Sequence, residues 1–171
     1  DLSKQGIEFY LISLEKNIRK AKQVSKDIEN FNLHWYRLKY VKIRFLGALI
    51  NEIQCLFLVA YVLFVKKIDI IHARSYLSLF PGLLLKKIYH FKLIFDMRGF
   101  WPEGLVEVGR IQNNSIPYKM LKILERKGIL LSDYIVVLTP EAKEIIEHDY
   151  KGKNLKVIWM PTCVDMDKFD N

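Results

Sequence analysis

The sequence predicts an α/β fold, a Rossmann-like domain of three layers built around a parallel sheet. Short runs rich in β-branched residues, such as residues 68–72 and 134–138, are typical of buried parallel strands. These runs alternate with helical segments, and that alternation implies right-handed crossovers between parallel strands. The chain has 171 residues and a hydrophobic fraction of 51%, which fits one domain with a sizeable core.

The individual elements follow from local patterns along the chain. The expected strands are residues 7–12, 33–40, 68–72, 92–96, 134–138 and 155–159. The expected helices are residues 15–30, 45–65, 77–89, 115–131 and 139–150. Ser115 and Thr139, each followed closely by a proline, have the residue types that cap helix N-termini. Residues 97–114 show no periodicity, so an irregular loop is expected there.

Two helices allow more specific expectations. In the helix at 115–131, the side chains of Met120, Leu121, Leu124 and Leu131 should share the buried face. Residues 45–65 form an apolar run about as long as a membrane-spanning helix. Because Asn51, Glu52 and Gln54 lie near its middle and a buried carboxylate is costly in lipid, we expect a helix covered by the protein core instead.

The formal net charge of +8 suggests an anionic partner: a phosphorylated substrate, a membrane surface or nucleic acid. A soluble protein with many surface lysines would look the same. One cationic helix could face anionic lipid, or could simply be solvated. Its basic residues are Lys16, Arg19, Lys20, Lys22 and Lys26. Nucleic acid is the weakest alternative, because the basic residues are dispersed and no such motif occurs.

Cysteine and histidine usage bounds the compartment and the metal chemistry. Cys55 and Cys163 are far apart, which favours a reducing, cytoplasmic compartment. The four histidines form no close ligand pair, so we expect no metal site. The glycine-rich phosphate loops of dinucleotide and nucleotide enzymes are missing, as is the Gly-x-Ser-x-Gly elbow of hydrolases. We therefore expect no cofactor.

Parallel sheets bind ligands beyond the carboxyl ends of their strands, and this rule selects the candidate site. His72 and Arg74 end one strand and could bind a hydroxyl and an anion. Alternatively, His72 bonds a backbone carbonyl and Arg74 is a surface residue. Thr139, at a helix N-terminus on the same edge, could bind phosphate or could serve only as a cap.

The segment that follows the strand at 92–96 is the stronger candidate. Asp96 can accept hydrogen bonds from sugar hydroxyls, and Arg98 can fork onto a phosphate or carboxylate. Gly99, Trp101 and Glu103 complete this candidate ligand-binding set, in which Trp101 offers a flat apolar face. The alternative is an Asp96–Arg98 ion pair that only shapes the loop. No residue is assigned a catalytic role.

The order of these pieces resembles the N-terminal domain of retaining GT-B-fold glycosyltransferases of family four, in its bacterial polysaccharide branch. The resemblance rests on IDIIHARS, KLIFDMRGFWPE, LERKGILLSDYIVVLTPEAKEII and LKVIWMPTCVDMDKF. It covers most of residues 68–169 and, more loosely, residues 2–13. One departure is Cys163, which stands where that family usually has glycine.

The resemblance implies that residues 1–171 are the acceptor-side Rossmann-like half of a glycosyltransferase, truncated at both ends. A missing C-terminal domain would bind the nucleotide-sugar donor, and this half alone would be inactive. Its partners would be that donor, a sugar or lipid-linked acceptor in polysaccharide or glycolipid synthesis, and an anionic membrane surface. Two alternatives stay open: a GT-B-fold sugar-nucleotide epimerase, and a non-catalytic Rossmann-like module that binds anionic lipid.

Overall fold

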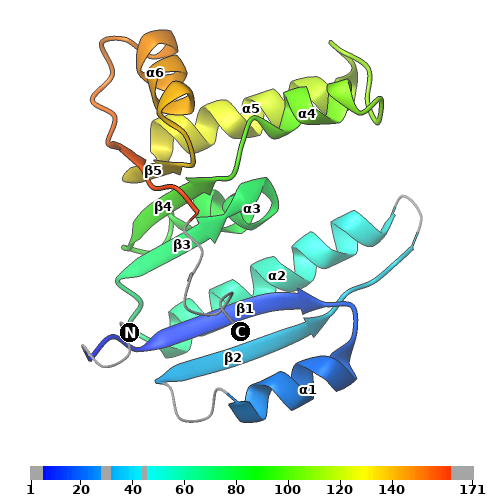
Figure 1. Cartoon of the computed structure of the whole chain (residues 1–171). Helices are drawn as coiled ribbons and strands as arrows, with labels where there is room; N and C mark the ends of the chain where they lie inside the picture. Colours follow the sequence, from blue (N-terminus) through cyan, green and yellow to red (C-terminus); the bar gives the residue numbers. More distant parts are fainter. Residues whose placement is uncertain (1–5, 28–31, 44–45, 163–171) are drawn as a thin grey trace, which may run out of the picture. The chain divides into compact units, whose positions relative to one another are not determined.

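The computed structural model describes residues 6–27, 32–43 and 46–162, and the chain divides into two compact units, Asp1–Lys67 and Ile68–Asn171 (Figure 1). Helices alternate with strands in both units, and all the strand pairs are parallel. The predicted α/β fold class is therefore confirmed. In place of one continuous sheet, the described residues form a two-stranded sheet in the first unit and a four-stranded sheet in the second.

The first unit consists of two strand–helix pairs. They are β1 (Phe9–Glu15), α1 (Ile18–Asp27), β2 (Leu33–Lys39) and α2 (Leu46–Val65). The two strands pair in parallel, from Phe9 opposite Leu33 to Glu15 opposite Lys39. The side-chain oxygen of Asn17 accepts hydrogen bonds from the backbone N–H groups of Arg19 and Lys20 at 3.1 and 3.2 Å, and so satisfies free donors at the start of α1.

Helix α2 departs from the prediction that the core would cover it. Only Gly47, Asn51, Val62 and Leu63 are buried in it, whereas Phe57 is 70% exposed and Phe64 81% exposed. Asn51 is buried because its side-chain amide exchanges hydrogen bonds with the backbone N–H and C=O of Val41, at 2.9 and 3.1 Å. By length and composition, α2 is a helix that could cross a membrane. The expectation that the protein core covers this helix was wrong.

The second unit contains four strands and four helices among its described residues. They are β3 (Ile70–Arg74), α3 (Ser75–Leu85), β4 (Lys92–Met97), α4 (Trp101–Glu107), α5 (Ile116–Leu131), β5 (Tyr134–Val137), α6 (Pro140–Asp149) and β6 (Val157–Trp159). The strand order is β3-β4-β5-β6, so each strand neighbours the next one in the chain. Helix α3 lies against β3, β4 and α5, and α6 lies against β5 and β6.

Every second residue of β4 belongs to the core beneath the helices. Leu93, Phe95 and Met97 are almost fully buried. A Cβ atom on Gly128 of α5 would lie 2.5 Å from Leu79 and 3.0 Å from Phe95, so only glycine allows α5 to approach this closely. Successive strand residues point to opposite faces, which places Asp96 on the face opposite Phe95.

Two expectations about helices in this unit were wrong. Residues 97–114 are not wholly irregular, because α4 occupies Trp101–Glu107. Pro102 lies in its first turn, where a missing N–H costs nothing, but seven residues are too few for a periodic apolar pattern. In α5 the buried positions are Glu125, Gly128 and Ile129, while Met120 is 65% exposed. The buried face of α5 was mispredicted because it contains a glutamate and a glycine, which are not residues expected in a hydrophobic stripe.

The start of β5 is fixed by a charged residue. Asp133 accepts hydrogen bonds from the Lys86 ammonium, from Lys92 at 3.2 Å and from the backbone N–H of Leu93 at 2.8 Å. Burial alone would raise the pKa of this carboxyl, but these donors outweigh it and lower the pKa to about 2. Asp133 therefore joins the end of α5 to β4 as an anion.

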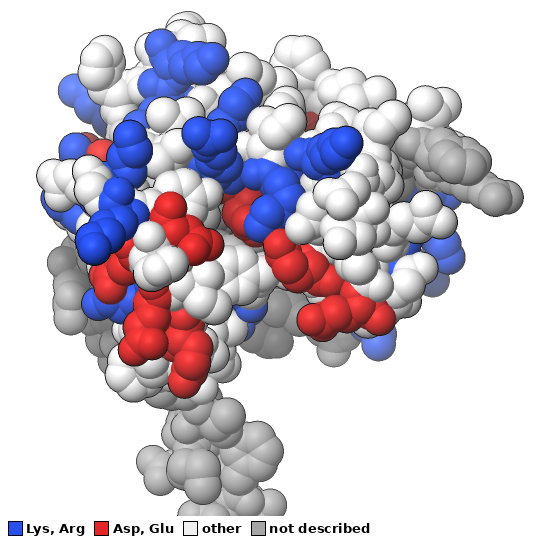
Figure 2. Space-filling model, turned by 90° about the horizontal axis from the view of Figure 1, so that it is seen from above, with Lys and Arg blue, Asp and Glu red and all other residues white. Residues whose placement is uncertain are grey.

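The cationic character of the sequence is visible on one side of the second unit. Figure 2 looks onto the side of α5 and α6, where Lys and Arg side chains gather over the upper part of the view and Asp and Glu side chains lie mainly below them, reaching into the middle of the face. The charges are thus grouped on this face and are not evenly mixed.

Candidate functional site

The carboxyl ends of β3, β4, β5 and β6 lie at one edge of the second sheet, here called the rim. The parallel pairing sets Arg74 opposite Asp96 and Met97 opposite Val137. The structure thereby places the residues that follow each strand at a common edge, as the sequence predicted. This edge is where open parallel sheets bind ligands.

The centre of the rim is a cluster of His72, Asp96 and Arg98. His72 Nε2 lies 3.2 Å from Asp96 Oδ2, where an N–H on that nitrogen donates to the carboxylate. The Arg98 guanidinium comes within 4.0 Å of the same oxygen. Asp96 is only 6% exposed, and its other oxygen, Oδ1, is buried without a hydrogen-bond partner among the described residues. A buried carboxylate oxygen without a donor is costly and rare in folded proteins. The groups of the cluster that a ligand can reach are those of His72, whose side chain is 57% exposed, and Arg98.

The cluster shows which contacts two of its members make, while their roles in ligand binding stay predictions. His72 bonds a carboxylate and not a backbone carbonyl. The contact of 4.0 Å between Arg98 and Asp96 is longer than a charge-assisted hydrogen bond, and Arg98 instead donates to Thr162 Oγ1 at 3.2 Å. The Arg98 side chain is 34% exposed and retains donors for a ligand.

The turn between β3 and α3 is strained next to this cluster. Ser75 has a φ of +73°, in the left-handed region that non-glycine residues rarely adopt. The Ser78 hydroxyl lies within hydrogen-bond distance of the carbonyls of Arg74 and Ser75 and helps to hold the turn. Arg74, the last residue of β3, is exposed at the rim. Strain of this kind is often found at ligand-binding turns.

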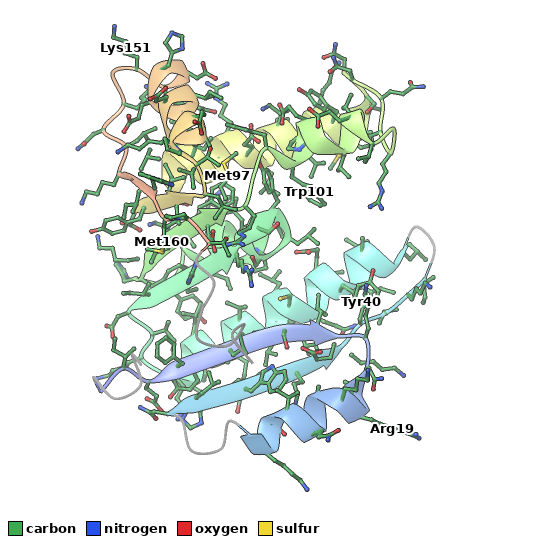
Figure 3. The ribbon with its side chains drawn as sticks, viewed as in Figure 1. Arg19, Tyr40, Met97, Trp101, Lys151 and Met160 are labelled. Atoms are coloured by element: carbon green, nitrogen blue, oxygen red, sulfur yellow. The ribbon has the colours of Figure 1, made fainter. Side chains whose placement is uncertain are left out.

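The segment from Gly99 to Trp101 is held from below by Tyr76 of α3. Gly99 has a φ of +151°, which a side chain would disfavour, and its carbonyl oxygen lies 3.2 Å from the Tyr76 hydroxyl. The backbone N–H of Trp101 donates to the same hydroxyl at 3.4 Å, and the two rings contact at 5.6 Å between centroids. Figure 3 labels Met97 and Trp101, which bracket this segment between β4 and α4.

A buried charged network lies behind that segment. The Tyr76 hydroxyl donates to Glu125 Oε2 at 2.5 Å, and the Lys122 ammonium bonds Glu125 and, at 2.8 Å, Glu103. Tyr118 also donates to Glu103, at 3.3 Å. Glu125 is 3% exposed. Glu103 is thus bound by α5, which gives it a structural role, and its contact with an acceptor stays a prediction.

The pKa directions agree with this network of fixed charges. Burial, together with the nearby Glu125 carboxylate, raises the pKa of Tyr76, so the phenol stays protonated and donates. Burial opposes the charge of Lys122, but hydrogen bonds to Glu103 and Glu125 outweigh burial and raise its pKa. Lys122 therefore stays a cation between two carboxylates at every pH at which the protein is handled.

Two threonines complete the rim. Thr139 caps α6, because its hydroxyl oxygen accepts from the Ala142 N–H at 3.1 Å, so the capping role is confirmed and phosphate binding stays a prediction. Thr162 follows β6 and meets Arg98. Trp159 of β6 donates from Nε1 to the Leu138 carbonyl at 3.1 Å and fixes the approach of that strand to β5.

Sequence reasoning missed Tyr76, Lys122, Glu125 and Thr162. Glu125 lies four residues after Leu121 and four before Ile129, on a helical stripe that also holds Gly128. A carboxylate on such a stripe was a usable signal, because an acid in that position needs a buried partner. Tyr76 and Thr162 gave no comparable signal, since their partners are distant in sequence.

Comparison with known proteins adds the family. No curated protein was found to match the chain. The model of Glycosyltransferase Family 4 matches residues 1–168, almost the whole sequence. The match agrees with the resemblance carried by the rim segments, and the parallel α/β architecture fits one Rossmann-like half of a GT-B fold. The chain belongs to Glycosyltransferase Family 4.

Proposed function

We propose that this chain is the acceptor-binding half of a glycosyltransferase that uses a nucleotide-sugar donor in polysaccharide or glycolipid synthesis. One observation carries the proposal: at the rim, the buried Asp96 bonds His72 through Oδ2, which also lies near Arg98, while its Oδ1 has no donor among the described residues. The family supports sugar transfer in general. A hydroxyl acceptor and a cation side by side suit a sugar that carries a phosphate.

In this proposal the rim residues bind and orient the acceptor. Asp96, together with the exposed His72 that it bonds, binds an acceptor hydroxyl, and Arg98 binds an acceptor phosphate through its free N–H groups. Trp101, held by Tyr76, offers its ring to the acceptor body. The donor would be bound by a separate domain, as the retaining GT-B resemblance implies.

We place this activity in the cytoplasm, at the inner face of the membrane. Support comes from cations in and just before α1, since Lys16, Arg19 and Lys20 are exposed. Exposed basic residues are attracted to anionic lipid headgroups.

The test of the proposal is the full-length enzyme with a substitution at Arg98. Arg98→Ala should lower transfer to a phosphate-bearing acceptor by about 10- to 100-fold, the effect of losing a charged hydrogen bond. Arg98→Lys should be nearly as harmful if the contact is a bidentate fork. Melting temperatures measured on the same samples separate binding from folding. A stable Arg98→Ala enzyme with full activity would contradict the proposal.

A second acceptor makes the role of Arg98 more specific. An octyl glycoside without phosphate offers the hydroxyls but not the anion. The loss caused by Arg98→Ala should be large with the phosphorylated acceptor and small with the glycoside. Equal losses with both acceptors would count against a phosphate contact.

A further inference from the structure

A hollow of about 430 Å³ lies between α5 and the C-terminal half of α6, within the size range of small-molecule sites. This α5–α6 cavity is lined by Phe100, Lys122, Glu125, Arg126, Ile129, Leu130, Ile145, Ile146, Asp149, Tyr150, Lys151 and Lys153. It takes residues from the far end of α6, whereas Thr139 at the first turn belongs to the rim. The lining adjoins the proposed acceptor site at Phe100, between Gly99 and Trp101, and shares Lys122 and Glu125 with the network behind it, while its other residues come from α5, α6 and the turn after α6.

The cavity has an apolar wall. Ile129 of α5 and Ile146 of α6, each 1% exposed, lie beneath the hollow, and Ile145 of α6, which is 45% exposed, offers open apolar surface. Phe100 and Tyr150 add aromatic surface to the lining. A ligand that reaches these side chains would bury hydrocarbon against them.

The acids that line the cavity already have partners. Glu125 is bonded by Tyr76 and Lys122, and Asp149 lies 3.2 Å from His148 Nδ1. These two carboxylates offset two of the four cations of the lining, Lys122, Arg126, Lys151 and Lys153, so an excess of two positive charges remains. The Lys122 charge is likewise used within the network.

Three other cations of the lining have no such partner. Arg126 comes from α5, and Lys151 and Lys153 come from the turn after α6, so the charges approach the hollow from both helices. In the part of the chain that the structure describes, none of the three forms a salt bridge. Figure 3 labels Lys151 at the end of α6, and Figure 2 shows the cationic side chains that gather on this face.

From this arrangement we infer that the α5–α6 cavity binds a phosphate monoester with a partly apolar body. Arg126 offers a planar fork, and the two lysines add point charges around a dianionic group. The isoleucine wall then contacts the body of the ligand. A lipid headgroup and a soluble phosphate ester share this chemistry, and the experiment separates them.

The experiment titrates the chain with three probes and follows isoleucine methyl signals by NMR. The probes are inorganic phosphate, glucose 6-phosphate and dihexanoyl phosphatidic acid. We expect saturable shifts at Ile129 and Ile146 with at least one of the two esters, and weaker binding of inorganic phosphate, which lacks a body. Preference for the lipid identifies a headgroup site, and preference for the sugar ester identifies a soluble ligand.

Matched variants locate the site. Arg126→Gln should weaken ester binding about tenfold, the effect of one charge-assisted contact, and Lys153→Gln should act in the same direction. Lys127→Gln is the control, because Lys127 is the exposed neighbour of Arg126 on α5 and does not line the cavity. Ile145→Trp fills the hollow without a change in charge and should also weaken binding.

Several results would overturn the inference. One is the absence of saturable shifts at both isoleucines with either ester. Another is equal weakening by Arg126→Gln and Lys127→Gln, which would reveal general attraction to a cationic face. A third is weakening by Arg98→Gln alone, which would assign the probes to the rim. Melting temperatures of all variants confirm that each one is folded.

Discussion

The carboxyl ends of the two sheets carry similar polar residues but use them differently. In the first unit, the Ser13 hydroxyl donates to Glu15 Oε1 at 2.6 Å, and Trp35 Nε1 donates to the Ser13 oxygen at 2.8 Å. In the second unit, Asp96 is buried with one oxygen that has no donor among the described residues. The position at a strand end is the same in both. An acid whose bonding capacity is left open distinguishes the rim as the candidate site.

The second difference lies in what supports the two edges. Behind the rim, Tyr76 and Lys122 hold the buried Glu125, and the Gly99–Trp101 segment rests on Tyr76. At the end of the first sheet, Arg37 stacks on Trp35 at 5.2 Å and donates to the Ala21 carbonyl at 3.2 Å, near the surface. A site that must keep its geometry needs support of the kind found behind the rim, where buried side chains hold the segment that carries the site.

The support behind the rim can be broken at Glu125. Glu125→Gln removes the charge that faces Tyr76 and Lys122 in a buried position and should cost about 1.5–3 kcal/mol of unfolding free energy. Chemical denaturation measures this loss. Glu107→Gln, an exposed acid on α4, is the control and should change stability little. Equal stability of the two variants would show that the network does not support the rim.

The close approach of α5 to the sheet gives the next effect. Gly128→Ala places a methyl group against Leu79 and Phe95 and should destabilise by about 1–3 kcal/mol through overpacking. Gly104→Ala in α4 is the control, because nothing lies within 4 Å of its added Cβ atom. Thermal unfolding of both variants compares them. A Gly128→Ala protein with the melting temperature of the wild type would show that α5 can move away from the sheet without loss of stability.

The smallest expected effect concerns the surface of the first unit. Each exposed basic residue in or just before α1 should contribute about 1 kcal/mol to the free energy of binding to an anionic membrane. Replacement of Lys16, Arg19 and Lys20 by glutamine, one after another, should therefore weaken vesicle binding stepwise. Co-sedimentation with anionic and neutral vesicles at rising salt measures it. Equal pelleting with both vesicle types would exclude this electrostatic mode.

Much of the fold could be predicted because local chemistry specified it. Ser115 and Thr139 cap helices as their residue types predict, since each hydroxyl accepts from an N–H three residues later. The strand at 134–138 was predicted within one residue, because a run of β-branched residues strongly favours a strand. These features depend on neighbours in the sequence.

The parts that could not be predicted depend on contacts between distant residues. The buried face of α5 depends on Glu125 meeting Tyr76, and nothing in the local sequence of α5 reveals that tyrosine. The exposure of α2 also escaped prediction, because a helix rich in large apolar side chains is expected to be buried. For the site, the strand-end rule gave His72, Asp96 and Arg98, but not Thr162, whose hydroxyl meets Arg98 from across the sheet.

The most direct test of the account is Asp96→Asn, measured for both transfer activity in the full-length enzyme and melting temperature. If Asp96 binds an acceptor hydroxyl, the loss of its charge should lower activity about 10- to 100-fold, a larger effect than the change in stability would explain. Glu15→Gln at the end of the first sheet is the matched control and should leave activity per folded molecule unchanged. An Asp96→Asn enzyme with full activity and a lowered melting temperature would contradict the claim that the rim binds the acceptor.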